Sequence, residues 1–164
     1  MIDILKLQLF DSQTRLITKF LKGEPYIYLA DERNSGRSYG VALCAIFNLL
    51  YLSTKTTAII SPHNLTNKIV ADYMDRIVEE HQLNKEYFYK SRRGGDNIRI
   101  SINDRECVFY NADEADKVRA YRPQHIFIDN ADQCPQDAVD FILNGVHFAK
   151  NPQVIQTIEM PNEF

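Results

Sequence analysis

Residues 26–40 have the sequence Tyr26-Ile-Tyr-Leu-Ala-Asp-Glu-Arg33-Asn-Ser-Gly36-Arg37-Ser38-Tyr39-Gly40. An apolar run of β type, from Tyr26 to Ala30, is followed by a short polar loop and then by a long apolar segment that begins at Arg37. This order of strand, loop and helix is typical of a phosphate-binding loop, in which backbone N–H groups and a helix N-terminus hold an anion. The stretch therefore predicts an anion site between its strand and its helix.

The loop matches the phosphate-loop pattern G-x-x-x-x-G-K-[ST] in part. Gly36 and Ser38 occupy their expected positions, whereas Asp31 stands in place of the first Gly and Arg37 in place of the Lys. Arginine keeps the positive charge but lacks the compact ammonium for which such a loop is shaped. The candidate phosphate-binding residues in this segment are Arg33, Asn34, Ser35, Gly36, Arg37, Ser38 and Tyr39.

The segment upstream of the loop, from Asp11 to Lys22, has the apolar spacing of an amphipathic helix. Asp11 or Ser12 is expected to cap its start. Gln13 lies in the first turn and has two interpretations. It is an exposed helix residue, or its side-chain amide binds the donor and acceptor edge of adenine.

Downstream of the loop, the pattern indicates a parallel α/β fold. Residues 37–52 are apolar nearly all round, as in a buried crossover helix, and Thr56 to Ser61 is expected to form a short buried strand. A helix capped by Asn64 or Thr66 and ending near His81 follows, which makes a β-α-β-α order. Residues 97–102 and 106–110 flank a tight turn and predict a β-hairpin. The fold class predicted is α/β, with three layers, a mainly parallel sheet and a hairpin insertion.

Between the second helix and the hairpin, residues 85–93 interleave aromatic and basic side chains. Such interleaving is found in nucleic-acid contacts. The alternative is a solvated loop, which suits the formal net charge of -3 better.

The stretch His125-Ile-Phe-Ile-Asp129-Asn-Ala-Asp132 carries the second candidate site. Its apolar residues predict a buried strand that ends at Asp129, at the edge where ligands bind in open α/β sheets. An Asp in this position is also common as a turn or helix cap. Together with the upstream loop, it predicts that Asp129 and Ser38 hold Mg²⁺, directly or through water.

The bulk composition is that of an ordinary globular protein of 164 residues, and we expect one domain. Cys44, Cys107 and Cys134 show no paired spacing and are expected to be small buried side chains. The longest apolar run, Val41 to Leu52, is too short to cross a bilayer, and the N-terminus lacks the features of a signal peptide. These features favour an intracellular protein with no membrane partner.

Four short motifs follow one another from Phe10 to Asn162. They are Phe10-Asp-Ser-Gln13, Arg33-Asn-Ser-Gly36-Arg37-Ser38, the segment Val118-Arg-Ala-Tyr-Arg-Pro-Gln-His-Ile-Phe-Ile-Asp129, and Thr157-Ile-Glu-Met-Pro161-Asn. In this order they resemble the adenine-binding Gln motif, the R-x-x-G-K-[ST] form of Walker A, Walker B and the coupling motif of the ATPase domain of viral large terminases. Terminases are the motors that pump DNA into phage capsids.

The resemblance implies a RecA-like P-loop ATPase that uses ATP and Mg²⁺ in the cytoplasm of an infected host cell. It assigns catalytic roles to Arg33, Arg37, Asp129 and Asn130, with Arg33 acting on the γ-phosphate. Implied partners are double-stranded DNA, other phage packaging proteins and further copies in a ring. The nuclease domain of the family has no counterpart in residues 1–164.

The chain departs from the family at Asn130, which stands where a water-activating Glu is found. An amide can orient a water but cannot accept its proton, and Asp132, two residues on, is a candidate substitute. One alternative is therefore a degenerate terminase-like module that binds nucleotide or assembles with partners without turnover. Another is the first RecA-like half of a helicase.

Overall fold

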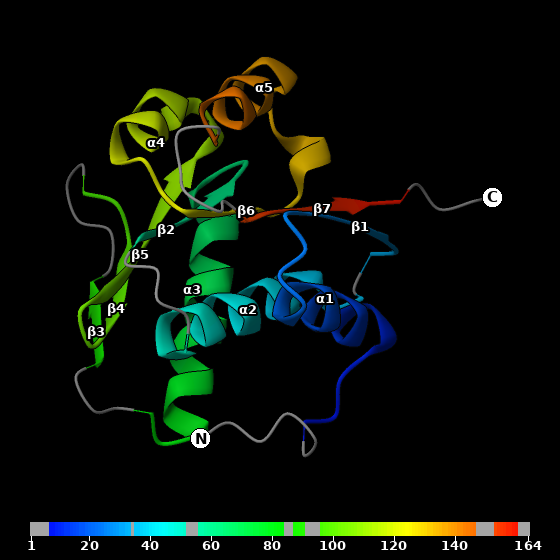
Figure 1. Cartoon of the computed structure of the whole chain (residues 1–164), viewed down its shortest axis with the longest axis vertical. Helices are drawn as coiled ribbons and strands as arrows, with labels where there is room; N and C mark the ends of the chain where they lie inside the picture. The colour runs from blue at the N-terminus through cyan, green and yellow to red at the C-terminus, as the bar shows by residue number, and fades with distance from the viewer. Residues whose placement is uncertain are drawn as a thin grey trace.

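The computed structural model describes residues 7–33, 35–51, 56–83, 87–90, 96–146 and 153–160. Helices and strands alternate along most of the chain (Figure 1). In chain order, with two short 3-10 helices labelled η, they are α1 (Asp11–Leu21), β1 (Tyr26–Asp31), α2 (Arg37–Tyr51), β2 (Thr56–Ser61), α3 (Asn64–Glu80), β3 (Tyr87–Lys90), β4 (Arg99–Ile102), β5 (Arg105–Asn111), η2 (Ala112–Glu114), α4 (Ala115–Tyr121), β6 (His125–Ile128), η3 (Ala131–Gln133), α5 (Gln136–Gly145) and β7 (Gln153–Glu159).

The described strands form one seven-stranded sheet in the order β1-β7-β6-β2-β5-β4-β3. The first five strands in this order pair in parallel, and β4 and β3 continue the sheet in antiparallel pairs. Only β7 separates β1 from β6. Because parallel strands end at the same edge of a sheet, the C-terminal ends of β1 and β6 lie close together.

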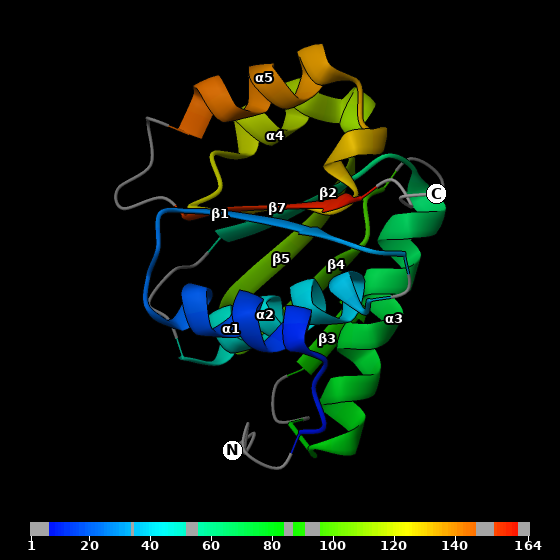
Figure 2. The same ribbon diagram turned by 90° about the vertical axis from the view of Figure 1, so that its right-hand side faces the viewer.

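Helices cover both faces of the sheet, as Figure 2 shows with α1, α2 and α3 on one side and α4 and α5 on the other. One buried apolar cluster lies between the sheet and the first three helices, and a second lies between the sheet and the last two. The predicted three-layer α/β architecture with a mainly parallel sheet is therefore confirmed.

The helix after the loop is buried along its length, as its composition predicts. Every residue of α2 from Gly40 to Leu49 is buried. The helix packs against α1 and α3 as well as the sheet. Its N-terminus, which carries Arg37 and Ser38, is thereby held in a fixed position beside the ends of the strands.

The hairpin prediction is confirmed, because β4 and β5 pair in antiparallel around Asn103, which has a φ of 57°. The loop interpretation of the preceding segment is wrong for residues 87–90, which form β3 at the edge of the sheet. The Tyr87 hydroxyl donates to Asp75 Oδ1 on α3 at 2.6 Å, a tertiary contact that the local pattern does not indicate. Residues 85, 86 and 91–93 lie outside the described residues, so the nucleic-acid contact stays a prediction.

The predicted helix caps are wrong. α1 begins after Phe10 and α3 after His63, and neither N-cap side chain makes a capping hydrogen bond. The Ser12 hydroxyl donates to the Ser35 carbonyl instead. At Ser12, a hydrogen bond to a residue of the loop after β1 has thus replaced the predicted capping hydrogen bond within its own helix.

The three cysteines are free and buried, as predicted. Burial raises the pKa of each thiol, to about 11 for Cys134.

Across the described part of the chain, no helix combines the length and the apolar character needed to span a bilayer.

A histidine buried in β6 predicts a dependence of stability on pH. His125 packs against the Phe20 ring at 6.4 Å between ring centroids, and burial lowers the pKa of its imidazole to about 4, against a weaker opposing effect of Gln153. The unfolded chain takes up a proton near pH 6.5 that the folded chain does not. Stability should therefore fall as the pH drops from about 6.5 to about 4, by up to about 3 kcal/mol.

Urea unfolding of the wild type and of His125→Gln between pH 7 and pH 4 measures this contribution. The variant should lose less stability over that range than the wild type, whereas the same substitution at the exposed His63 should not change the profile. Parallel profiles for the wild type and His125→Gln would show that the imidazole is not the cause.

Candidate nucleotide and metal site

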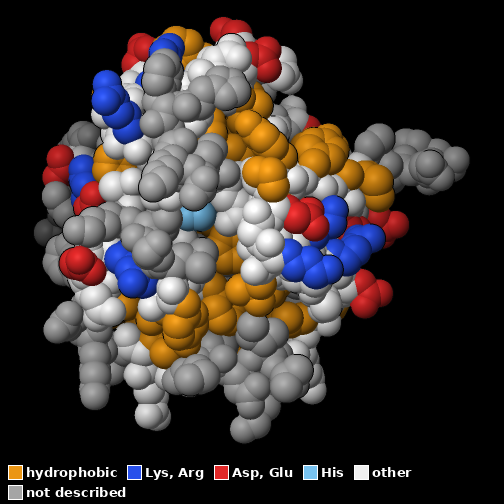
Figure 3. Space-filling view, in the orientation of Figure 1, with side chains coloured by type: hydrophobic (Ala, Val, Ile, Leu, Met, Phe, Trp, Pro, Cys, Tyr) orange, Lys and Arg blue, Asp and Glu red, His pale blue; other side chains and the backbone are white. Residues whose placement is uncertain are grey.

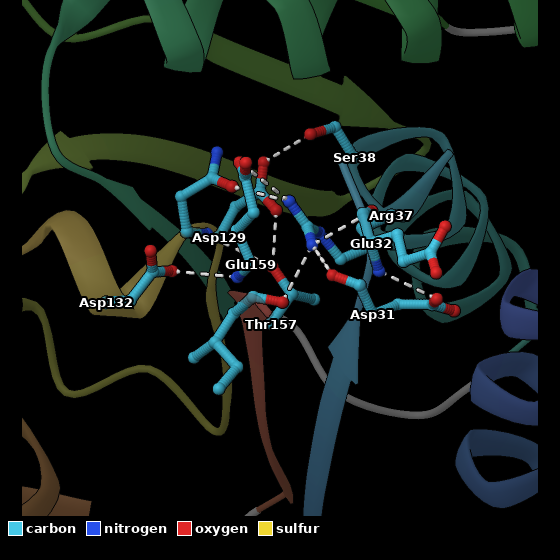
Figure 4. Close-up of polar contacts among 10 residues, drawn as sticks. Asp31, Glu32, Arg37, Ser38, Asp129, Asp132, Thr157 and Glu159 are labelled. Atoms are coloured by element: carbon cyan, nitrogen blue, oxygen red, sulfur yellow. Dashed lines mark hydrogen bonds and ion pairs between the residues drawn. The ribbon is translucent and has the colours of Figure 1, made fainter. Parts of the chain in front are cut away.

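The candidate site lies where the C-terminal ends of β1, β7 and β6 meet the first turn of α2 (Figure 4). Asp31, the last residue of β1, pairs with Glu159, the last residue of β7, and Asp129 follows β6 directly. In parallel sheets this edge is where ligands bind. The two candidate stretches, far apart in sequence, are thus brought to one place.

Two side chains of α1 bind the backbone of the loop after β1. Ser12 Oγ donates to the Ser35 carbonyl at 2.8 Å, and Gln13 Nε2 donates to the Gly36 carbonyl at 3.0 Å. Gly36 has a φ of +77°, a conformation that glycine adopts at little cost. Two side chains of one helix turn therefore fix the backbone of the loop.

Gln13 is only 4% exposed, so the exposed-helix interpretation of this residue is wrong. Its Oε1 accepts the Phe10 N–H at 2.9 Å while its Nε2 donates to Gly36. A side-chain amide has two N–H donors and two lone pairs on oxygen. One donor and one acceptor are therefore left over, which is the combination that the edge of adenine requires.

Because the Gln13 side chain lies against Gly36, we expect the Gly36→Ala substitution to destabilise the fold by about 2–3 kcal/mol. A Cβ at this position would lie 2.3 Å from Gln13 Nε2, in addition to the strain of the positive φ. The free energy of unfolding in urea measures the loss.

Gly23 provides the matched control. It has a φ of +72°, and its Cβ would meet nothing within 4 Å. Gly23→Ala should cost only the backbone strain, about 1 kcal/mol. Equal costs at the two positions would contradict the packing of Gln13 under the loop.

Hydrogen bonds to Asp129, which follows β6, join this strand to α2 and to β7. Ser38 Oγ donates to Asp129 Oδ2 at 2.6 Å, and Thr157 Oγ1 on β7 donates to Asp129 Oδ1 at 2.6 Å. Asp129 itself is fully buried, at 0% exposed. Burial raises the pKa of its carboxyl group, and the hydrogen bonds from Ser38 and Thr157 and the charge of Arg37 oppose that rise.

The chemistry of these side chains fits a magnesium ion. The carboxylate of Asp129 and the hydroxyl of Ser38 are hard oxygen ligands in contact with one another, and Mg²⁺ is commonly held by one or two protein oxygens together with substrate phosphates and water. Among the described residues, no group of three or more acidic, His or Cys side chains could hold a metal.

Arg37, which replaces the loop lysine, is 7% exposed and lies between the ends of β1 and β7. Its Nη1 donates to the carbonyls of Asp31, Glu32 (3.2 Å) and Ile158 (2.8 Å). Its Nη2 has two longer contacts of 3.5 Å, to Asn130 Oδ1 and Glu159 Oε2. One side of the guanidinium thus binds the backbone, and the side with the weaker contacts is the one placed to meet a phosphate oxygen.

Asn130 and Asp132 take different places at the end of β6. Asn130 adopts a left-handed conformation with a φ of 53°, and its N–H donates to Thr157 Oγ1 at 3.1 Å. Asp132 Oδ1 accepts the backbone N–H of Glu159 at 3.1 Å. Asp132 therefore supports β7, and its position gives no support to its role as a substitute for the missing Glu.

Two open pockets lie side by side over the loop and share Gly36, Tyr39 and Tyr73 as walls. The first is lined by residues of the N-terminal segment and α1, including Phe10 and Gln13. The second is lined by Arg33, Ser35, Arg37, Ser38, Ile69 and Asn130. Their adjacency offers one pocket for a base and one for phosphates.

The structure brings most of the predicted site residues to these pockets. Gln13, Arg33, Ser35, Gly36, Arg37, Ser38, Tyr39 and Asn130 line one or both. Asp129 lies beneath Ser38, and Asn34 lies outside the described residues. The sequence analysis missed Tyr73, whose ring packs edge to face against that of Tyr39 at 5.5 Å between ring centroids. It also gave no separate role to Thr157 and Glu159, for which the loose coupling motif was the only signal. The Pro161-Asn162 end of that motif is outside the described residues.

No protein-family model matches the chain, and no curated protein matches it in sequence. Solved structures do match it in fold. The large terminase of a thermophilic bacteriophage has a TM-score of 0.73 and 10% identity over 93% of this chain and 39% of that protein. The same terminase in complex with ADP has a TM-score of 0.68 and 12% identity, over 92% and 38% of the two chains.

Two other phage proteins give the same result. The large terminase ATPase domain of a Thermus phage has a TM-score of 0.62 and 15% identity over 97% of this chain and 72% of that domain. The Phi-28 gp11 DNA packaging motor has a TM-score of 0.53 and 9% identity, over 87% and 49%. The described elements, their sheet order and these likenesses agree, and the chain has the RecA-like α/β fold of the ATPase domain of phage large terminases.

Proposed function

We propose that this chain is a terminase-like P-loop ATPase that binds ATP with Mg²⁺ and hydrolyses it to drive viral DNA packaging. The observation that carries the proposal is the 2.6 Å contact between Ser38 Oγ and Asp129 Oδ2. It joins the phosphate loop to the strand-end carboxylate, and this pair holds the metal in P-loop NTPases.

The adjacent pockets support nucleotide binding. The adenine ring would lie against Phe10 and Tyr39 with its edge on Gln13, and the phosphates would lie over residues 35–38. A structural relative, the phage terminase solved with ADP, is a nucleotide complex. Arg33, exposed at the mouth of the second pocket, would act on the γ-phosphate, and Ser38 and Asp129 would hold Mg²⁺, whose charge stabilises the triphosphate.

The packaging partners are proposed by likeness to the relatives, which include a DNA packaging motor. Double-stranded DNA, other packaging proteins and further copies of this chain in a ring are the partners that such a motor requires. On the face shown in Figure 3, Lys and Arg side chains of the described residues lie beside Asp and Glu side chains. The proposed location is the cytoplasm of an infected host cell.

Phosphate release from ATP, measured with and without double-stranded DNA, tests the proposal. A parallel titration with ATP and Mg²⁺ measures binding separately from turnover. We expect ATP to bind with Mg²⁺ dependence and DNA to accelerate phosphate release. A chain that binds neither ATP nor ADP would refute the proposal.

A second function, a non-catalytic nucleotide-binding or assembly module, is favoured by one observation. Asn130 occupies the strand end beside Asp129, and its amide cannot accept a proton from water. Binding of ATP with no phosphate release under any condition would select this module over the motor.

A further inference from the structure

Hydrolysis at this site would be accelerated by a group that accepts the proton of the attacking water, and Asn130 cannot accept it. The carboxylates that surround the Arg37 guanidinium among the described residues are the candidates. Asp129 is fully buried and bonded by Ser38 and Thr157. Because of these contacts, and of the metal that it would hold, Asp129 is not the group that accepts a proton from water.

Two other carboxylates near the site are occupied by contacts of their own. Asp31 accepts the N–H of Glu32 at 2.8 Å and pairs with Arg15 at 3.2 Å. Asp132 accepts the backbone N–H of Glu159 at 3.1 Å. Asp31 therefore stabilises the loop and Asp132 stabilises β7, and neither lines the pocket that Asn130 lines.

Glu159 is the carboxylate that contacts the Nη2 side of Arg37, a residue that lines the second pocket. Its Oε2 lies 3.5 Å from Arg37 Nη2, and the same nitrogen lies 3.5 Å from Asn130 Oδ1. The Glu159 side chain is 30% exposed, so water can reach it. Figure 4 shows it among Asp129, Thr157 and Arg37. It therefore shares Arg37 Nη2 with the amide that stands where a base would be expected.

The strand holds Glu159 in this position. Glu159 pairs with Asp31 in the β1–β7 ladder, and its backbone N–H donates to Asp132 Oδ1. Thr157, two residues before it, bonds Asp129. Residues 157 and 159 point to the same face of a strand because side chains alternate along β-structure.

We propose that Glu159 is the catalytic base of this site, replacing the carboxylate that Asn130 lacks; the inference depends on the proposed ATPase function. Water attacks the γ-phosphorus of ATP, Glu159 accepts a proton of that water, and the bond between the γ-phosphorus and the bridging oxygen breaks. ADP leaves with the electron pair of that bond, and the proton then passes from Glu159 to solvent. Asn130 orients the same water by hydrogen bonding.

The test is Glu159→Gln, which keeps an acceptor for Arg37 but removes the negative charge and the ability to take a proton. We expect kcat for phosphate release to fall by about 10²-fold or more. The Kd for ATP and ADP, measured by calorimetry, and the Tm should not change. Glu159→Asp, which keeps a carboxylate, should retain more turnover than Glu159→Gln.

Glu24→Gln makes the same change in charge at the opposite end of β1, where Glu24 pairs with Lys19 at 3.9 Å, and should leave turnover unchanged. Full turnover in Glu159→Gln would overturn the inference, as would equal loss in the Asp and Gln variants or a weakened Kd in place of a lowered kcat. A wild-type chain that binds ATP without turnover overturns it too, but leaves nucleotide binding intact. Absence of any nucleotide binding would instead refute the proposed function.

Discussion

Replacing Asp129 with Asn is expected to lower ATP turnover by about 10³-fold, the largest effect that we predict. The substitution keeps the size of the side chain and an oxygen that can accept from Ser38 or Thr157. It removes the negative charge that would hold Mg²⁺ beside the triphosphate. The affinity for ATP in the presence of Mg²⁺ should therefore fall as well, while the affinity in EDTA should change little.

Phosphate release and calorimetric titration, each with Mg²⁺ and with EDTA, measure these effects. Asp140→Asn serves as the control, since Asp140 lies on α5 and bonds only Gln136 among its contacts in the described structure. The control should behave as the wild type does. If Asp129→Asn retained Mg²⁺-dependent binding of ATP, the assignment of Asp129 as a metal ligand would be wrong.

Removing the Arg37 side chain is expected to destabilise the fold by about 3 kcal/mol, the largest loss of stability that we predict for a substitution. Arg37→Ala would leave the carbonyls of Asp31 and Ile158, on two different strands, without their shared donor. It would also leave Glu159 without the guanidinium. Arg37→Lys should recover only part of the loss. It restores the positive charge, but a single ammonium cannot bind both strand ends and Glu159 at once.

Urea unfolding of both variants measures the loss, and Arg15→Ala provides a comparison. Arg15 pairs with Asp31 at 3.2 Å, but its side chain is 61% exposed. Exposed ion pairs contribute only about 0–1 kcal/mol. A loss in Arg37→Ala as small as that in Arg15→Ala would mean that Arg37 does not join the two strands.

Local patterns along the chain were sufficient for most of the elements. The nearly all-apolar surface of α2, the buried run of β2 and the turn at Asn103 each follow from residues within a few positions of one another. β3 was missed because only four residues form it and its stability comes from pairing with β4 and from the Tyr87–Asp75 contact. Asp75 lies 12 residues before Tyr87, and neither partner leaves a periodic signal within the four residues of β3.

The sequence by itself determined the α/β class, the polar loop between β1 and α2 and the acid that follows β6, because each depends on local propensity and spacing. Only the tertiary structure decided what the side chains bind. β7, from the end of the chain, enters the sheet between β1 and β6 and brings Thr157 to Asp129 and Glu159 to Arg37. Arg37 bonds a carbonyl 121 residues away. Contacts of this range arise from strand order and packing, which no short stretch of sequence encodes.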